Sequence, residues 1–189
     1  MLFRSRENLP LYGYGVKGFA LSLVETAIEL TDGAIPAQVI AEILGLAKQL
    51  LLHPLDLLDH VAEVVPRLAE NYRLVLITKG DLFHQETKVA ASGLAGHFEG
   101  VEIVAEKAAP DYQRVLARYG VEPGRFVMVG NSLRSDILPP VELGGRAIHI
   151  PHEHTWAHEL AELPAELASA VTILDSMAQV PAVLGHLAG

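Results

Sequence analysis

The feature that most constrains the fold of this chain is an alternation, starting near Tyr72, of short apolar runs with amphipathic helical patterns. The runs are rich in Val, Ile and Leu, as buried strands are. The three helical stretches between the first four strands each close at a glycine, a common helix terminator. This alternation predicts a parallel sheet with helices on both faces, a Rossmann-like three-layer α/β/α fold. The expected strands are 74–77, 101–104, 126–129, 147–150 and an edge strand at 171–174, and the expected helices are 81–92, 110–119 and 133–143.

The stretch from residue 17 to residue 70 has a different pattern, because its apolar residues recur at helical spacing with no strand-like run. Two or three amphipathic helices are expected here. Thr31-Asp32-Gly33 should end the first helix, Pro36 suits the first turn of the second, and His53-Pro54 should end it. We therefore expect a helical subdomain at 1–55 and an α/β core at 56–189.

The charge balance narrows the possible partners. The 189 residues include 14 Lys plus Arg against 23 Asp plus Glu, for a formal net charge of −9. An acidic chain without a basic run lacks the charge pattern of a nucleic-acid binder. No apolar run approaches the roughly 18 residues of a membrane span, and no signal peptide is evident, so no membrane partner and a cytoplasmic location are expected. Because the chain has no Cys, a bound metal would have oxygen or imidazole ligands.

Polar residues follow three of the expected strands. Thr78-Lys79-Gly80 follows the first strand, Lys107 the second, and a loop from Asn131 to Asp136 the third. Singly, each has an ordinary structural explanation as a helix cap, a turn or a lysine at the sheet rim. Ligands of open α/β sheets bind beyond the carboxyl ends of the strands. The residues taken together therefore indicate one site.

This set of residues resembles the haloacid dehalogenase (HAD) superfamily of phosphohydrolases, and the likeness spans the whole chain. The resemblance implies that the Thr78 hydroxyl binds the transferring phosphoryl group, with the Lys79 and Gly80 amides nearby. It also implies that Lys107 neutralises the charge of phosphate and nucleophile. Positioning and positive charge are what phosphoryl transfer mainly requires. Thr78 and Lys107 are thus the expected catalytic residues, and a small phosphorylated metabolite is the expected substrate.

The same resemblance places a magnesium site on the loop after the third strand. Asp136 matches a direct ligand, and Asn131 stands where the family more often has Asp, which implies weaker magnesium binding or a contact through water. Magnesium prefers a few carboxylates, water and substrate phosphate. The helical segment at 1–55 resembles the family's cap, incomplete at its N-terminus, and Lys17 lies in a Gly- and Tyr-rich stretch expected to face the phosphate.

The family reaction uses an aspartate nucleophile in an Asp-x-Asp motif at the end of a first, central strand. No two aspartates of this sequence are two residues apart. We therefore expect a chain that lacks that strand and has little activity alone; the alternative is a non-catalytic module that binds phosphate or metal. Loss of a central strand would leave two sheet edges unpaired, which must close on each other, accept another segment or pair with a second copy in a homodimer.

Two competing sites are weaker. His149, His152, His154 and His158 are close in sequence, but the helical zinc signature with its second His is absent. Their role is left open, with a loop and exposed helix face near the site rim as the simpler explanation. Ser132 and Ser135 suggest a serine hydrolase, but their surroundings do not match the G-x-S-x-G elbow.

Overall fold

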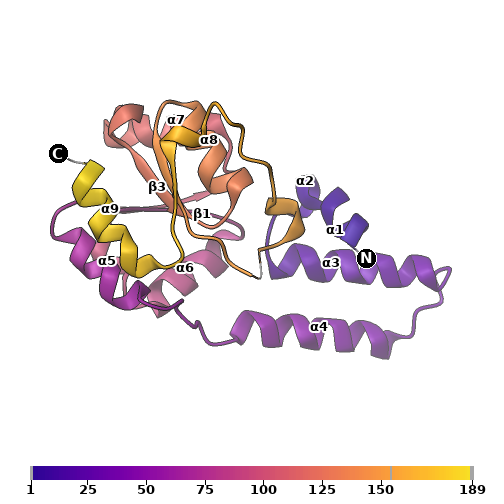
Figure 1. Cartoon of the computed structure of the whole chain (residues 1–189). Helices are drawn as coiled ribbons and strands as arrows, with labels where there is room; N and C mark the ends of the chain where they lie inside the picture. The colour runs from indigo at the N-terminus through magenta and orange to yellow at the C-terminus, as the bar shows by residue number, and fades with distance from the viewer. Residues whose placement is uncertain (1, 154, 188–189) are drawn as a thin grey trace. The chain divides into compact units, whose positions relative to one another are not determined.

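The computed structural model describes residues 2–153 and 155–187, and its contacts divide the chain into two compact units (Figure 1). One unit comprises Met1–Asp56 and Thr78–Gly93, and the other comprises Leu57–Ile77 and Leu94–Gly189. The expected domains at 1–55 and 56–189 stay a prediction, from which this grouping differs by assigning 78–93 to the first unit. The first unit holds α1 (Leu2–Glu7), α2 (Leu9–Tyr12), α3 (Val16–Leu30), α4 (Ala37–Leu52) and α6 (Leu82–Ala91).

Helices α3 and α4 form a hairpin, lying side by side in Figure 1. The expected break occurs where it was predicted, with Asp32 and Gly33 at φ 49° and 83°, in the left-handed region that a helix cannot continue through. Helix α4 begins after Pro36 and buries none of its residues. The sequence analysis did not anticipate α1 and α2; buried Asn8 ties this segment to α3 by donating to Ser22 Oγ at 3.1 Å.

The second unit contains the α/β layers. Its longer elements are α5 (Val61–Ala69), β1 (Val75–Lys79, shared with the first unit from Thr78), β2 (Gly100–Val104), α7 (Ala109–Tyr119), β3 (Val127–Gly130), a π-helical turn (Leu133–Ile137), α8 (Leu138–Glu142), β4 (Arg146–His149), β5 (Val171–Ile173) and α9 (Val180–Leu187). Short 3₁₀ turns lie at Ala95–His97, Pro123–Arg125, Ala157–Glu159, Ala168–Ala170 and Met177–Gln179.

Strand β4 is the centre of a three-stranded parallel sheet in the order β3-β4-β5. Successive residues of a strand face opposite sides. Ala147 packs with Ile137 and Val141 on the side of α8, and Ile148 packs with residues of α5 and α9. Figure 1 shows α7 and α8 on one side of these strands and α5 and α9 on the other. The predicted three-layer α/β/α arrangement with parallel strands is confirmed.

Strands β1 and β2 form a separate two-stranded sheet. Within 2–153 and 155–187, β1 is not hydrogen-bonded to β3, although Ile77 of β1 and Met128 of β3 belong to one apolar cluster around Tyr112 of α7. The edges of β1 and β3, expected to be left unpaired by the missing strand, therefore have not paired with each other within these ranges. No helix in the described part of the chain is long and apolar enough to cross a membrane.

Candidate functional site

Lys107 and Asp136 form a buried ion pair in the α/β unit. Lys107 lies between β2 and α7, and Asp136 lies in the π-helical turn after β3. Lys107 Nζ donates to Asp136 Oδ1 at 2.7 Å, with the two side chains 12% and 7% exposed. The backbone N–H of Ser132 donates to the other carboxylate oxygen at 3.1 Å. The structure thus brings together the predicted phosphate-binding lysine and the predicted metal-binding aspartate.

Gly130 explains how Asp136 reaches this position. A Cβ at residue 130 would lie 2.5 Å from the Cβ, Cγ and Oδ2 atoms of Asp136. Only a glycine leaves room for the carboxylate to lie against the end of β3. The turn that presents Asp136 is tightened further because Ser132 O accepts from both Asp136 N and Ile137 N, at 2.8 and 3.2 Å.

Asn131, the other predicted metal ligand, is exposed at the end of β3 and is held from two directions. Its Nδ2 donates to Thr155 Oγ1 at 3.0 Å. Its backbone oxygen lies 3.1 Å from Nε2 of buried His149. Because a carbonyl only accepts, Nε2 carries the proton and donates this bond. One histidine of the His149–His158 group thus supports the loop.

The donor set of this loop suits magnesium. Asp136 supplies carboxylate oxygens, each with a lone pair beyond the one used by Lys107 or Ser132, and Asn131 supplies an amide oxygen. Gly130 leaves room for the Asp136 carboxylate at the end of β3, as a metal-binding aspartate there would require. No group of three or more His, Asp or Glu side chains suited to a metal occurs in the described ranges. That Asp136 and Asn131 hold a magnesium ion, completed by water and phosphate, stays a prediction.

Ser132 and Ser135 contact Glu159, a residue that the sequence analysis did not identify. Both serine hydroxyls donate to Glu159 Oε2 at 2.5 Å. The carboxylate comes from the Ala157–Glu159 turn, 24 and 27 residues further along the chain. No local sequence signal marks such a pairing. Both hydroxyls donate to a carboxylate, an arrangement that differs from a serine nucleophile beside a histidine base.

The remaining predicted residues lie in the first unit. Lys17 Nζ donates to both oxygens of Asp81, at 3.0 and 2.9 Å, and Thr78 Oγ1 donates to Gln85 Oε1 at 3.4 Å. The Lys79 ammonium lies 4.2 Å from the centre of the Tyr14 ring, a cation–π contact. That Thr78, Lys79, Gly80 and Lys17 serve the same phosphate as Lys107 stays a prediction.

Asp81 also caps α6, because its Oδ1 accepts from His84 N at 3.0 Å. The hydrogen bond from Lys17, followed by the one from His84, holds the pKa of the Asp81 carboxyl below its usual range. Gly80, at φ 138°, adopts a backbone conformation that side chains disfavour. The local geometry after β1 is therefore set by a helix cap and a glycine turn.

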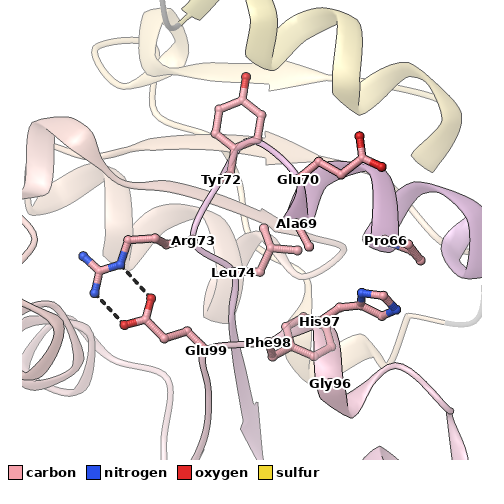
Figure 2. A pocket seen from close by; sticks show the side chains of 10 residues that line it. All are labelled: Pro66, Ala69, Glu70, Tyr72, Arg73, Leu74, Gly96, His97, Phe98 and Glu99. Carbon is pink, nitrogen blue, oxygen red and sulfur yellow. Dashed lines mark hydrogen bonds and ion pairs between the residues drawn. The ribbon is translucent and has the colours of Figure 1, made fainter.

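Two further features are the rest of the histidine group and a separate cavity. His154 lies outside the described residues, and Trp156 and His158 have ring centres 5.0 Å apart. A cavity of about 550 Å³ opens at the start of β1 and β2, beside the ion pair of Arg73 with Glu99 (Figure 2). Its lining includes no predicted site residue.

Comparisons with known proteins identify the family and the fold of this chain. A family model for the haloacid dehalogenase-like hydrolases matches residues 4–144. The mouse N-acylneuraminate-9-phosphatase is 30% identical over 183 residues, which cover 87% of this chain and 74% of that protein. A haloacid dehalogenase-like family hydrolase from Xanthomonas campestris is 41% identical with a TM-score of 0.86, covering 98% of this chain and 74% of its own. A magnesium-bound HAD hydrolase from Bacillus subtilis shares the fold at 15% identity and a TM-score of 0.61, over 88% of this chain and 69% of its own.

Proposed function

The chain belongs to the haloacid dehalogenase-like hydrolases, and from that premise we propose that it provides the phosphate- and magnesium-binding part of a phosphatase acting on a small phosphorylated metabolite. The observation that carries this proposal is the buried Lys107–Asp136 ion pair at the end of β3. A lysine and a carboxylate kept in one nearly dry place can hold a phosphate and its cation together. The relatives named N-acylneuraminate-9-phosphatase make phosphorylated sugar acids the first substrates to test.

In this proposal, Lys107 places an ammonium against the phosphate oxygens, and the Thr78 hydroxyl with the Lys79 and Gly80 amides donates hydrogen bonds to them. Asp136 and Asn131 hold the magnesium ion, which supplies further positive charge when bound. Water is largely excluded around Lys107 and Asp136, which strengthens these charge interactions.

The family reaction proceeds through an aspartyl-phosphate, and this sequence has no Asp-x-Asp pair to form one. Asp136 is not the nucleophile in this proposal, because its carboxylate is assigned to the magnesium ion. We therefore expect the 189-residue chain by itself to release little phosphate. The alternative is a non-catalytic module that uses the same residues to bind phosphate or metal.

Magnesium-dependent phosphate release distinguishes these two functions. It is measured with an aryl phosphate and with N-acylneuraminate 9-phosphate, on the chain itself and on a form with an N-terminal apolar strand ending in Asp-x-Asp. A gain of several orders of magnitude in the extended form supports the phosphatase, because nucleophile and metal ligands act as a unit. Equal inactivity of both forms with intact phosphate binding supports the module. Brisk turnover by the chain alone, abolished by Asp136→Ala, would show that another nucleophile exists.

Anion binding tests the assignment of Lys107 directly. Lys107→Ala should weaken inorganic phosphate binding more than Lys79→Ala, because the part expected of residue 79 belongs to its backbone. Isothermal titration calorimetry measures both variants against the unchanged chain. An equal effect of the two substitutions would contradict the assignment.

The edges of β1 and β3 lead to a proposal about assembly. Strand edges without partners tend to pair with another chain, and no β1–β3 pairing occurs in the part of the chain that the structure describes. We expect a homodimer through these edges. Analytical ultracentrifugation of the chain should show a dimer, and a monomer at all concentrations would rule this assembly out.

A further inference from the structure

Thr155 and Glu159, in the segment after β4, both contact the loop that carries Asn131 and Asp136. We infer that Thr155 and Glu159 are positioning residues that orient the Asn131 amide and the Ser132–Asp136 turn for a divalent cation. We call this segment, residues 155–159, the clasp. The inference rests on the proposed function, because it concerns the same metal site.

Thr155 decides which end of the Asn131 amide is available to a cation. The hydroxyl of Thr155 donates its single proton to His152 O at 2.7 Å. Thr155 Oγ1 therefore has only lone pairs to offer Asn131, and it accepts from Asn131 Nδ2 at 3.0 Å. This fixes the NH₂ group of the amide on the clasp side. The amide oxygen, the atom that a hard cation binds, points to the other side.

Glu159 holds the turn that presents Asp136. Ser132 and Ser135 are both 5% exposed, and each donates its hydroxyl proton to Glu159 Oε2. Ser132 Oγ in turn accepts from Ser135 N at 2.9 Å. Ser132 thus touches Glu159 through its side chain and Asp136 through its backbone. Without Glu159, two buried hydroxyls would need new acceptors, and the turn would rearrange to supply them.

The clasp acts on the cation site only through the loop. Thr155 accepts from the Asn131 side chain, Glu159 accepts from the Ser132 and Ser135 hydroxyls, and the carboxylate of Asp136 accepts hydrogen bonds from Lys107 and from the Ser132 backbone. Residues that orient metal ligands in this way commonly change metal affinity by about 10- to 100-fold when they are replaced. Substitutions of Thr155 and Glu159 should therefore lower cation affinity by more than any change in the stability of the fold explains.

The test measures magnesium binding by the chain with isothermal titration calorimetry, alongside NMR of the Asn131 side-chain NH₂ group. The clasp variants are Thr155→Val, Thr155→Ser, Glu159→Ala and Glu159→Gln. Glu162→Gln is the matched control, because Glu162 is an exposed carboxylate close by in sequence. Glu159→Ala and Glu159→Gln remove the same charge, and only Gln keeps the length of the side chain and an acceptor oxygen for the two serines.

Thr155→Val and Glu159→Ala should weaken magnesium binding on the order of tenfold or more. Thr155→Ser and Glu159→Gln should restore most of that loss, and Glu162→Gln should bind like the unchanged chain. The Asn131 NH₂ resonances should shift in Thr155→Val and return in Thr155→Ser. A merely structural role would not move these resonances in step with affinity.

Two outcomes overturn the inference, and they are distinguishable. If the chain binds magnesium, Asp136→Asn abolishes binding, and all clasp variants bind normally, the clasp has no positioning role while the proposed function stands. If the chain binds no magnesium, or Asp136→Asn leaves binding unchanged, the metal site of the proposed function is wrong, and the inference is wrong with it.

Discussion

Two lysine–aspartate pairs, one in each unit, have similar geometry and different surroundings. Lys107 Nζ lies 2.7 Å from Asp136 Oδ1 with side chains 12% and 7% exposed, whereas Lys17 Nζ lies 2.9 Å from Asp81 Oδ2 with side chains 53% and 28% exposed. Water screens the second pair, so its net contribution to stability is small. The first pair is largely dry, and each charge depends on the other. Burial, more than distance, therefore distinguishes the two ion pairs.

The local backbone also treats the two aspartates differently. Asp81 is a helix N-cap, a role that needs only a side-chain oxygen. Asp136 lies against Gly130 and accepts from the backbone of Ser132. A glycine, a π-helical turn and a buried lysine thus together position the Asp136 carboxylate. This difference leads to predictions of decreasing size.

The largest effect should come from removing the lysines. Lys107→Met leaves a buried carboxylate without its counter-charge and should lower the free energy of unfolding by about 3 kcal/mol. Lys17→Met should cost less than about 1 kcal/mol, because its pair is solvent-screened. Urea unfolding measures both. Equal costs for the two variants would erase the distinction between the pairs.

The next effect concerns the space for Asp136. Gly130→Ala places a Cβ 2.5 Å from three atoms of that side chain, so the turn must shift, at a cost of about 2 kcal/mol. Gly124→Ala is the matched control, since a Cβ there meets no atom within 4 Å. Thermal and urea unfolding of the two variants should differ clearly. A Gly130→Ala protein as stable as the Gly124→Ala protein would show that the carboxylate is not confined.

A smaller effect is expected at the exposed pair. Asp81→Ala removes the cap of α6 and should cost about 1 kcal/mol, while Asp81→Asn keeps a capping oxygen and should cost only a few tenths. The difference assigns the stabilising role of Asp81 to capping. If Asp81→Asn costs as much as Asp81→Ala in urea unfolding, the ion pair with Lys17 matters more than its exposure suggests.

The smallest effect is a change in pH dependence. Burial, followed by the nearby charge of Lys88, lowers the pKa of His84 from its ordinary 6.5. A lowered pKa in the folded state means that the unfolded chain takes up the proton first, so stability is complete above about pH 6.5 and falls as the pH drops toward the folded pKa. His84→Gln should flatten this dependence between about pH 7 and pH 5.

The lowered pKa of Asp81 acts in a separate window. Its contribution is present above the ordinary carboxyl value of 3.8 and is lost as the pH falls through the folded pKa. Asp81→Asn should therefore lower stability slightly at neutral pH and alter the pH dependence of stability only in acid, so it serves as the control for His84→Gln. Identical pH profiles of the unchanged chain and His84→Gln would contradict the assignment of the higher window to His84.

The α/β layers were predictable from the sequence because their signals are local. Runs such as 147–150 alternate between two faces, and Ala147 and Ile148 do pack on opposite sides of β4. The Lys107 and Asp136 assignments came from position after a strand together with a family resemblance. Their direct contact was not given by strand pairing, because Lys107 follows β2 of one sheet and Asp136 follows β3 of the other.

Other features depend on contacts that no local pattern encodes. Thr155 and Glu159 come from an irregular segment whose hydrogen bonds reach back 24 to 27 residues. The helix expected at 133–143 begins as a π-helical turn because Ser132 O accepts from two N–H groups. Periodicity predicted an amphipathic second helix, and α4 forms at that place without burying any of its residues.

The most direct test of the account is the position of a divalent cation in crystals of this chain. Manganese, which shares the oxygen-ligand preference of magnesium, is soaked in with inorganic phosphate and located by its anomalous scattering. The account predicts one strong peak beside the Asp136 carboxylate and the Asn131 amide oxygen, with phosphate next to Lys107, and no such peak in Asp136→Asn crystals. A peak at Asp81, or a peak that persists in Asp136→Asn, would contradict it.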